Sequence, residues 1–279
     1  MKRIVTIQDI SCVGKCSLTV ALPIISAMGV ETAIVPTAVL STHTMFQNPT
    51  CVDLTDEIEP ISRHWVSEQI TFDAIYTGYL ASDRQISLVG DFFRTFRRED
   101  APIIVDPAMA DNGKLYPAFS PEFPQQMKKL CSQADIILPN ITEAALLTGL
   151  PYKETYDRAY PEELLKALAA LGPRYSVLTG VSLAPGRLGI MGYDAKENRF
   201  FQYATEHLPV SYHGTGDIFA STFTGALVRG RSLEEALQIA CDYVVETIQV
   251  TMNNPNSRSY GVDFETTIPW LVKRLEQTR

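Results

Sequence analysis

The stretch SYHGTGDIFAST, residues 211–222, decides how the rest of the chain is interpreted. Apolar residues recur after it at helical spacing, so a helix begins close to its glycines. One capping residue would be enough to start a helix, yet Gly214 and Gly216 bracket Thr215. Glycines leave backbone N–H groups bare, and the helix dipole favours an anion at this end. The stretch therefore predicts a phosphate site.

The next residue, Asp217, lies in the first turn of this predicted helix and has two interpretations. A carboxylate there commonly stabilises the helix through its dipole. Beside an anion site it is also a candidate general base, which deprotonates an alcohol attacking phosphorus. The residues elsewhere in the chain have to decide between the two.

The composition of the 279 residues is that of a folded protein, with 46% hydrophobic and 20% charged residues. A formal net charge of −8 argues against nucleic acids and anionic membranes as partners, because both need a basic face. We find no signal peptide and no apolar run long enough to span a membrane. The five scattered cysteines form no C-x-x-C pair, which indicates reduced thiols in a cytoplasmic protein.

Short β-rich runs alternate with longer amphipathic stretches, which predicts an α/β fold with a mainly parallel sheet and helices on both faces. No linker or repeat divides the chain, so we expect one domain over residues 1–279. The predicted strands are 3–7, 32–36, 74–77, 103–105, 136–138 and 176–178. The predicted helices are 17–28, 82–98, 143–148, 161–171, 216–229, 233–252 and 267–277.

Ligands of such sheets bind beyond the carboxyl ends of the strands, so the residues after each strand are candidates. Asp9 follows the first strand, and Gly14 and Lys15 come soon after it. A phosphate-binding P-loop would need a glycine at Asp9 and a hydroxyl residue at Cys16, so that motif is excluded. We therefore interpret Lys15 as a surface lysine, and Asp9 as a carboxylate at the edge of the sheet where the carboxyl ends of the strands lie.

The second and third predicted strands are also followed by polar or aromatic residues. The cluster at 41–44 is most simply explained by turn chemistry, the default for Ser and Thr. Tyr79 offers a flat face to a ligand, and a core tyrosine is an equally good interpretation.

Acidic residues follow the fourth and fifth predicted strands. Asp106 ends a buried strand, where an unpaired carboxylate is costly, and 111–113 is an exposed turn that can act as a lid. Asn140 and Glu143 have the spacing of a capping box, which explains both structurally. Alternatively, these two residues and Asp106 hold a hydrated Mg²⁺.

Taken together, these segments resemble the ribokinase-like kinases, and within them the pyridoxal (vitamin B6) kinases. Residues 214–217 are similar to the C-terminal signature of that family, and 139–144 to its Asn-x-x-Glu segment. Residues 106–116 resemble the segment after the fourth strand, and 41–44 and 77–79 the two segments that hold the pyridine. The resemblance runs through most of the chain in the same order.

The resemblance implies a ribokinase-like three-layer α/β/α sandwich that transfers phosphate from ATP to the 5′-hydroxymethyl group of a B6 vitamer. It further implies Mg²⁺, a monovalent cation such as K⁺, and a homodimer. In this pattern Asp217 is the catalytic base, and residues 214–216 stabilise the transferred phosphoryl group. The nucleotide and metal side comprises Asp106, Asp111, Asn140, Glu143 and Thr179, with Asp106 and Glu143 nearest the metal. The substrate side comprises Asp9, Ser41, His43, Thr44, Tyr79 and Asp217.

Two departures from the family bear on the substrate. Asp9 stands where pyridoxal kinases have a serine that contacts the pyridine, and His213 precedes the anion hole at a variable position. We hypothesise that Asp9 favours a cationic substrate such as pyridoxamine. Hydroxymethylpyrimidine kinase remains an alternative, although its glycine-rich segment after the first strand is missing. A catalytically dead relative would have no reason to retain Asp217. We expect the adenine pocket around residues 244–254.

Overall fold

A nine-stranded sheet forms the centre of the computed structural model, which describes residues 1–277. Its strands are β1 (Arg3–Ser11), β2 (Glu31–Leu40), β3 (Cys51–Asp53), β4 (Ala74–Thr77), β5 (Ile103–Val105), β8 (Ile136–Ile137), β9 (Tyr175–Val181), β10 (Arg187–Asp194) and β11 (Arg199–Glu206). They are ordered β11-β10-β9-β8-β5-β4-β1-β2-β3. Neighbours from β9 to β2 are parallel, whereas β3, β10 and β11 pair antiparallel, which confirms a mainly parallel sheet.

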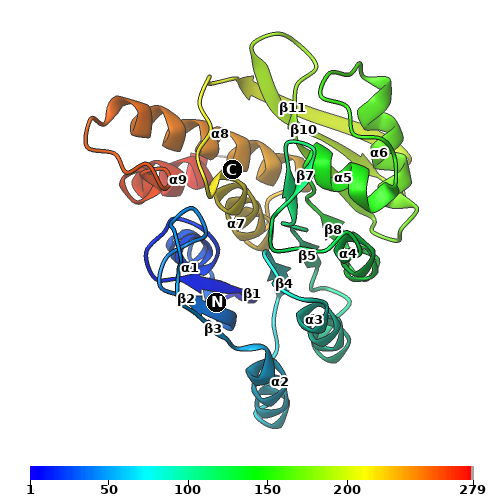
Figure 1. Cartoon of the computed structure of the whole chain (residues 1–279), viewed down its shortest axis with the longest axis vertical. Coiled ribbons are helices and arrows are strands. Elements are labelled where there is room, and N and C mark those ends of the chain that lie inside the picture. The colour runs from blue at the N-terminus through cyan, green and yellow to red at the C-terminus, as the bar shows by residue number, and fades with distance from the viewer. Residues whose placement is uncertain (278–279) are drawn as a thin grey trace.

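Helices cover both faces of this sheet, so the predicted three-layer sandwich is confirmed (Figure 1). One layer holds α2 (Ile58–Ser67), α3 (Asp83–Phe96), α4 (Phe123–Cys131), α5 (Ile141–Thr148) and α6 (Ala159–Ala169). The other holds α1 (Leu18–Ala27), α7 (Thr215–Val228), α8 (Leu233–Asn253) and α9 (Phe264–Gln277). A 3₁₀ turn, η1 (Thr55–Glu57), precedes α2, and a small hairpin of β6 (Ala110–Asp111) and β7 (Lys114–Leu115) follows β5.

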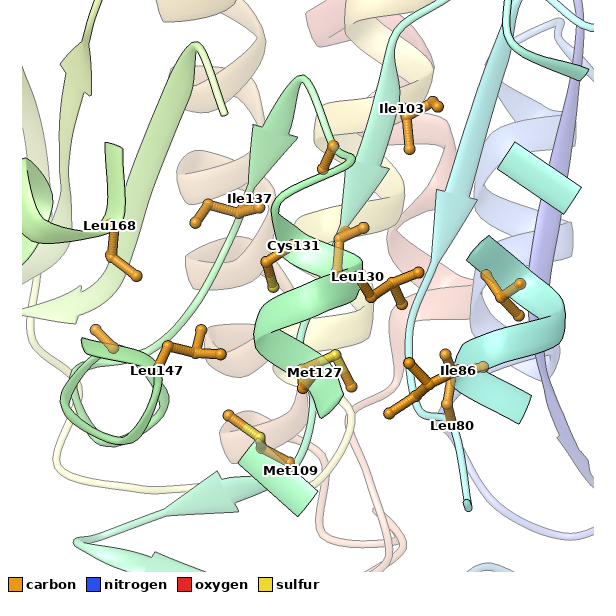
Figure 2. Packing of buried hydrophobic residues seen from close by; sticks show 14 of the residues in the cluster. Leu80, Ile86, Ile103, Met109, Met127, Leu130, Cys131, Ile137, Leu147 and Leu168 are labelled. Carbon is orange, nitrogen blue, oxygen red and sulfur yellow. The ribbon is translucent and has the colours of Figure 1, made fainter. Parts of the chain in front are cut away.

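Successive apolar residues of a strand belong alternately to two separate hydrophobic cores, one on each face of the sheet. In β5, Ile103 and Val105 pack against the layer of α2 to α6, while Ile104 packs against the layer of α7 and α8. Figure 2 shows the first core close by, with Ile137 of β8 between residues of the helices. Because successive strand side chains point to opposite faces, continuous apolar runs were the right signal for strands buried on both sides.

The predicted strands and helices all exist, but the prediction that the first strand ends at residue 7 was wrong. β1 runs to Ser11, so Asp9 lies inside the strand and not after it. The extension exists because Ile10 and Ser11 continue to pair with β2 beyond a shift of register after Gln8. Asp9 therefore sits on a rigid element at the carboxyl end of β1.

The sequence patterns missed β10 and β11 altogether. Glycines at 189 and 192 interrupt the β-rich pattern of β10, and glycine is unfavourable in strand interiors. The structure shows why glycine is required at both positions. A Cβ at Gly189 would lie 2.1 Å from the carbonyl oxygen of Tyr203, and one at Gly192 would lie 2.2 Å from the ring of Phe201. Close packing against β11 therefore selects glycine here.

The strand order reverses beside β1, because β2 lies on one side of it and β4 on the other. Such a switch point opens a crevice at the carboxyl ends of the strands, where ligands of open α/β sheets bind. No helix within residues 1–277 is long and apolar enough to cross a membrane.

Candidate functional site

The N-terminus of α7 contains Gly214 and Gly216, and the structure shows that the two glycines are needed for different reasons. Gly214 caps the helix with a left-handed backbone, φ 81°, and a Cβ there would lie 1.8 Å from the carbonyl oxygen of Lys15. Gly216 is exposed, and a Cβ there would meet nothing within 4 Å. Only Gly216 leaves open space beside the amides, which suits access by an anion.

Asp217 is half-buried at this helix end, and its pKa is raised from the usual range to about 7. Burial is the main cause, because it penalises the charged carboxylate. A hydrogen bond from the backbone of Ser17 opposes the shift, and the negative charge of Asp9 adds to it. A carboxylate that titrates near neutral pH is well suited to accept a proton.

A cavity of about 440 Å³ opens in front of α7. It is lined by all the residues expected on the nucleotide side, and its lining contains no lysine or arginine within the described chain. Apolar residues of α8 form another wall, in the region where the adenine pocket was expected. The predicted residues that line it are Asp106, Asp111, Asn140, Glu143, Thr179, Gly214, Thr215, Gly216 and Asp217.

Asn140 and Glu143 form the capping box that their spacing predicted. The Asn140 side chain accepts a hydrogen bond from the Glu143 amide at 2.9 Å, and Glu143 Oε2 accepts one from the Asn140 amide at 2.9 Å. Glu143 Oε1 also accepts from the amide of Met109 at 3.1 Å. The structural interpretation is therefore confirmed, and it fixes the Glu143 carboxylate at the cavity wall.

The cavity is strongly acidic. The pKa of Asp106 is raised, first by burial and then by the negative charges of Glu143 and Asp217. Burial also raises the pKa of Glu143, against the hydrogen bonds from the backbone. An anionic ligand in such a cavity needs a cation to offset the repulsion, because carboxylates otherwise raise the energy of every nearby negative charge.

These residues fit a hydrated divalent cation better than a dense metal centre. Residues 1–277 contain no group of three or more His, Cys, Asp or Glu side chains placed to hold a metal ion. The Asp106 carboxylate accepts no hydrogen bond from the described chain, so its oxygens remain available. Glu143 is already occupied by backbone amides. Few carboxylates and many waters are what Mg²⁺ prefers.

The predicted turn at 111–113 is the tip of the β6–β7 hairpin beside this cavity. Asn112 and Gly113 have φ values of 50° and 76°, as two-residue hairpin turns require. Asp111 accepts hydrogen bonds from the amide and side chain of Asn112, at 2.8 and 3.0 Å. The Gly113 amide donates to Thr142 Oγ1 at 2.9 Å, which ties the hairpin to α5.

The residues expected on the substrate side do not line the cavity itself, apart from Asp217. Asp9 is 5% exposed, and its carboxylate accepts a hydrogen bond from the Ser11 hydroxyl at 3.2 Å. The charge of Asp9 raises the pKa of both Asp217 and Tyr79, to about 7 and about 12, although burial is the larger cause in each. Asp9 is therefore close enough to act electrostatically on both the candidate base and the tyrosine.

Tyr79 is half-buried and packs against Phe119, with ring centroids 5.4 Å apart, so it is not a core tyrosine. In the loop that follows β2, the Ser41 hydroxyl accepts a hydrogen bond from the Thr50 amide at 2.9 Å. A bond of this kind stabilises the turn, as the sequence predicted. Thr44 is exposed on the same loop. The structure thus assigns Ser41 a role in closing the loop.

His43 is the buried member of this loop, only 5% exposed. Its ring packs with those of Phe46, His213 and Tyr260, at centroid distances of 5.4, 5.6 and 6.4 Å. Its Nδ1 accepts the Met45 amide at 3.2 Å, whereas Nε2 has no partner among the described residues. An unpaired buried nitrogen is costly and is available to a ligand.

Lys15 is not the surface lysine that the sequence suggested. Its side chain is 13% exposed, and its Nζ lies 2.9 Å from Asp263 Oδ1 and 3.0 Å from Glu265 Oε2. The sequence analysis missed this ion pair because its members lie 248 and 250 residues apart. No local pattern signals such a contact.

Known proteins with similar sequences and folds are kinases. The sequence profile of the phosphomethylpyrimidine kinase family matches residues 22–262. A crystal structure of a provisionally assigned phosphomethylpyrimidine kinase from Bacteroides thetaiotaomicron, in a form with pyridoxal, is 39% identical, covering 97% of this chain and 95% of its own with a TM-score of 0.91. The pyridoxal kinase from Lactobacillus plantarum is 32% identical, covering 100% and 99%, also with a TM-score of 0.91.

Among curated relatives, a pyridoxine/pyridoxal/pyridoxamine kinase from Bordetella avium is 27% identical over 89% of this chain and 85% of its own. These similarities agree with the ribokinase-like segments found in the sequence. The protein is a kinase, and the chain belongs to the phosphomethylpyrimidine kinase family.

Proposed function

We propose that the protein is an ATP-dependent kinase that phosphorylates the 5′-hydroxymethyl group of a B6 vitamer, namely pyridoxal, pyridoxine or pyridoxamine. The observation that carries the proposal is the placement of Asp217, with a pKa of about 7, at an open helix N-terminus facing an acidic cavity. The 39% identical protein crystallised with pyridoxal supports this class of substrate.

In the proposed mechanism, the Asp217 carboxylate accepts the proton of the substrate hydroxyl as its oxygen attacks the γ-phosphorus of ATP. The free amides at residues 214–216 stabilise the negative charge on the transferred phosphoryl group. Substrate would lie at the switch point between β1 and β4, with the pyridine held by Asp9, His43 and Tyr79. The unpaired Nε2 of His43 supplies one polar contact there.

The nucleotide occupies the cavity in this proposal. Its adenine lies against Val244, Val245 and Ile248 of α8, and its phosphates face Asn140 and Thr179. Mg²⁺ would be held by Asp106 directly and by Glu143 through water, and it would neutralise phosphate charge in a cavity whose described lining has no lysine or arginine. A K⁺ requirement, a homodimer and a cytoplasmic location stay predictions.

A hydroxymethylpyrimidine kinase is the second candidate, because the matching family profile bears the phosphomethylpyrimidine kinase name. Both reactions transfer phosphate to a hydroxymethyl group on a flat heteroaromatic ring, so residues 214–217 serve either one. The two substrates differ in the groups around the ring, and Asp9 and His43 are among the residues proposed to contact those groups.

A coupled assay of ADP release separates these candidates. We expect turnover with at least one of pyridoxal, pyridoxine and pyridoxamine, and kcat/KM higher for it than for 4-amino-5-hydroxymethyl-2-methylpyrimidine. A reversed order would assign the pyrimidine reaction. Absence of ADP release with all four compounds would sink the proposal, provided that the protein is folded and ATP is saturating.

We predict that Asp9→Ser lowers the preference for pyridoxamine over pyridoxal. The carboxylate is 5% exposed and close to the substrate crevice, so it attracts the aminomethyl cation more strongly than in water. Losing it should reduce the ratio of the two kcat/KM values by about tenfold, the worth of one partly desolvated charge contact. An unchanged ratio, measured in the same assay, would remove Asp9 from substrate selection.

A further inference from the structure

The loop between β1 and α1 is held by contacts on three sides. Its Lys15 Nζ binds Asp263 and Glu265, and a Cβ at Gly261 would lie only 2.5 Å from Lys15 Cβ. Asp263 is itself fixed, because Asn254 Nδ2 donates to its Oδ2 at 2.7 Å. The lysine therefore ties this loop to the segment that joins α8 to α9.

The same loop contacts the N-terminus of α7. The Lys15 carbonyl oxygen is so close to Gly214 that no Cβ fits between them, as described above. Thr19 Oγ1 of α1 donates to the carbonyl oxygens of Gly14 and Cys16, at 3.1 and 2.7 Å, which closes the loop on its other side. The position of the loop thus determines what faces Asp217.

Ser17, at the end of this loop, contacts both acids of the site. Its backbone lies against Asp217 and its hydroxyl against Asp9, and each contact lowers the pKa of the carboxyl concerned, against the effect of burial. To do so it adopts φ 51° and ψ −133°, which is rare for a residue with a side chain. Such a conformation persists only where surrounding contacts impose it, and it is often found at functional sites.

We propose that Lys15 is a positioning residue, whose ion pair with Asp263 holds the 14–17 loop so that the Ser17 amide orients and hydrogen-bonds the Asp217 carboxylate. The inference rests on the proposed role of Asp217 as base. Lys15 contacts neither substrate nor nucleotide in this view; it acts through the loop. Without the ion pair, Ser17 relaxes from its strained conformation and the carboxylate loses its partner.

The test compares Lys15→Met with Asp263→Asn, which is isosteric and removes the other half of the pair. Each should lower kcat by about 10- to 100-fold, the usual effect of misplacing a catalytic group, with a smaller change in KM. The double variant should lose about as much kcat as Lys15→Met alone, because Lys15→Met already removes the contacts of the lysine with both Asp263 and Glu265.

The pH profile distinguishes positioning from a simple effect of charge. In the wild type we expect the acidic limb of kcat/KM to fall near pH 7, where Asp217 titrates. Loss of the Ser17 hydrogen bond raises the pKa of Asp217, so the limb should move to higher pH in both variants. A through-space effect would instead move it in opposite directions, because one variant removes a positive charge and the other a negative charge.

Other groups that face Asp217 are unchanged in these variants: Asp9 on β1, Cys16 in the loop, Tyr76 on β4 and Asp106 after β5. The control is Arg174→Met, which breaks an ion pair with Asp194 of 3.2 Å at the opposite edge of the sheet. It should leave kcat and the pH limb at wild-type values.

Opposite limb shifts, or wild-type kcat and limb in both variants at equal folded fraction, would overturn the inference. A change confined to KM would do the same, because it would place Lys15 in binding. These failures are distinct from failure of the proposed function. If Asp217→Ala is fully active, the base is elsewhere and both proposals fall; if it is inactive while Lys15→Met is normal, only the positioning role does.

Discussion

Asp217→Ala should lower kcat by about 10²- to 10⁴-fold, the contribution of a general base, and by more if the hydroxyl is also mispositioned. ATP should still bind with nearly unchanged affinity, because the cavity walls of α5, β9 and α8 are untouched. ADP release measures the first quantity, and nucleotide titration by calorimetry the second. Turnover close to that of the wild type would remove Asp217 from the mechanism.

Asp217→Asn provides the matched control, since it keeps the shape of the side chain and removes the charge. The pKa of Asp217 is about 7 in the folded protein against a usual 3.8, so the folded state binds the proton more tightly. The wild type therefore loses stability from this group as pH rises through that range. We expect Asp217→Asn to match the wild-type Tm near pH 4 and exceed it at pH 8, which excludes unfolding as the cause of inactivity.

Gly214→Ala should destabilise the protein by about 2–5 kcal/mol, combining the cost of a left-handed alanine with that of overpacking. The backbone has φ 81°, and the added Cβ would collide with the carbonyl oxygen of Lys15 at 1.8 Å. Urea denaturation with an unchanged m-value measures the loss. A loss in the free energy of unfolding of less than about 1 kcal/mol, the usual cost of a tolerated substitution, would contradict this geometry.

Gly216→Ala is the companion to this substitution, because it adds the same methyl group two residues away in open space. Its stability should equal or exceed that of the wild type, since alanine favours a helix over glycine by about 1 kcal/mol. Its kcat should still fall by about tenfold or more, because the methyl crowds the amides that stabilise the phosphoryl group. If both results are obtained, Gly214 is required by the fold and Gly216 by the proposed ligand.

Local patterns were enough for most of the fold. The continuous apolar runs of β4 and β5 predicted their bounds, and the spacing of Asn140 and Glu143 predicted their capping box. These features depend on neighbours in the sequence, so the sequence alone carries them. β10 escaped prediction because its Gly189 and Gly192 are explained only by β11, which packs against them.

The sequence by itself determined the class of fold, the glycine-flanked start of α7 and the acids Asp106 and Glu143 that follow β5 and β8, because each is encoded within a few adjacent residues. The tertiary structure decided that Asp9 lies inside β1 beside Asp217, and that Lys15 pairs with Asp263 across 248 residues. It also raised the pKa of Asp217 to about 7. Burial and contacts between distant segments exist only once the chain has folded, and they are what turn these residues into a site.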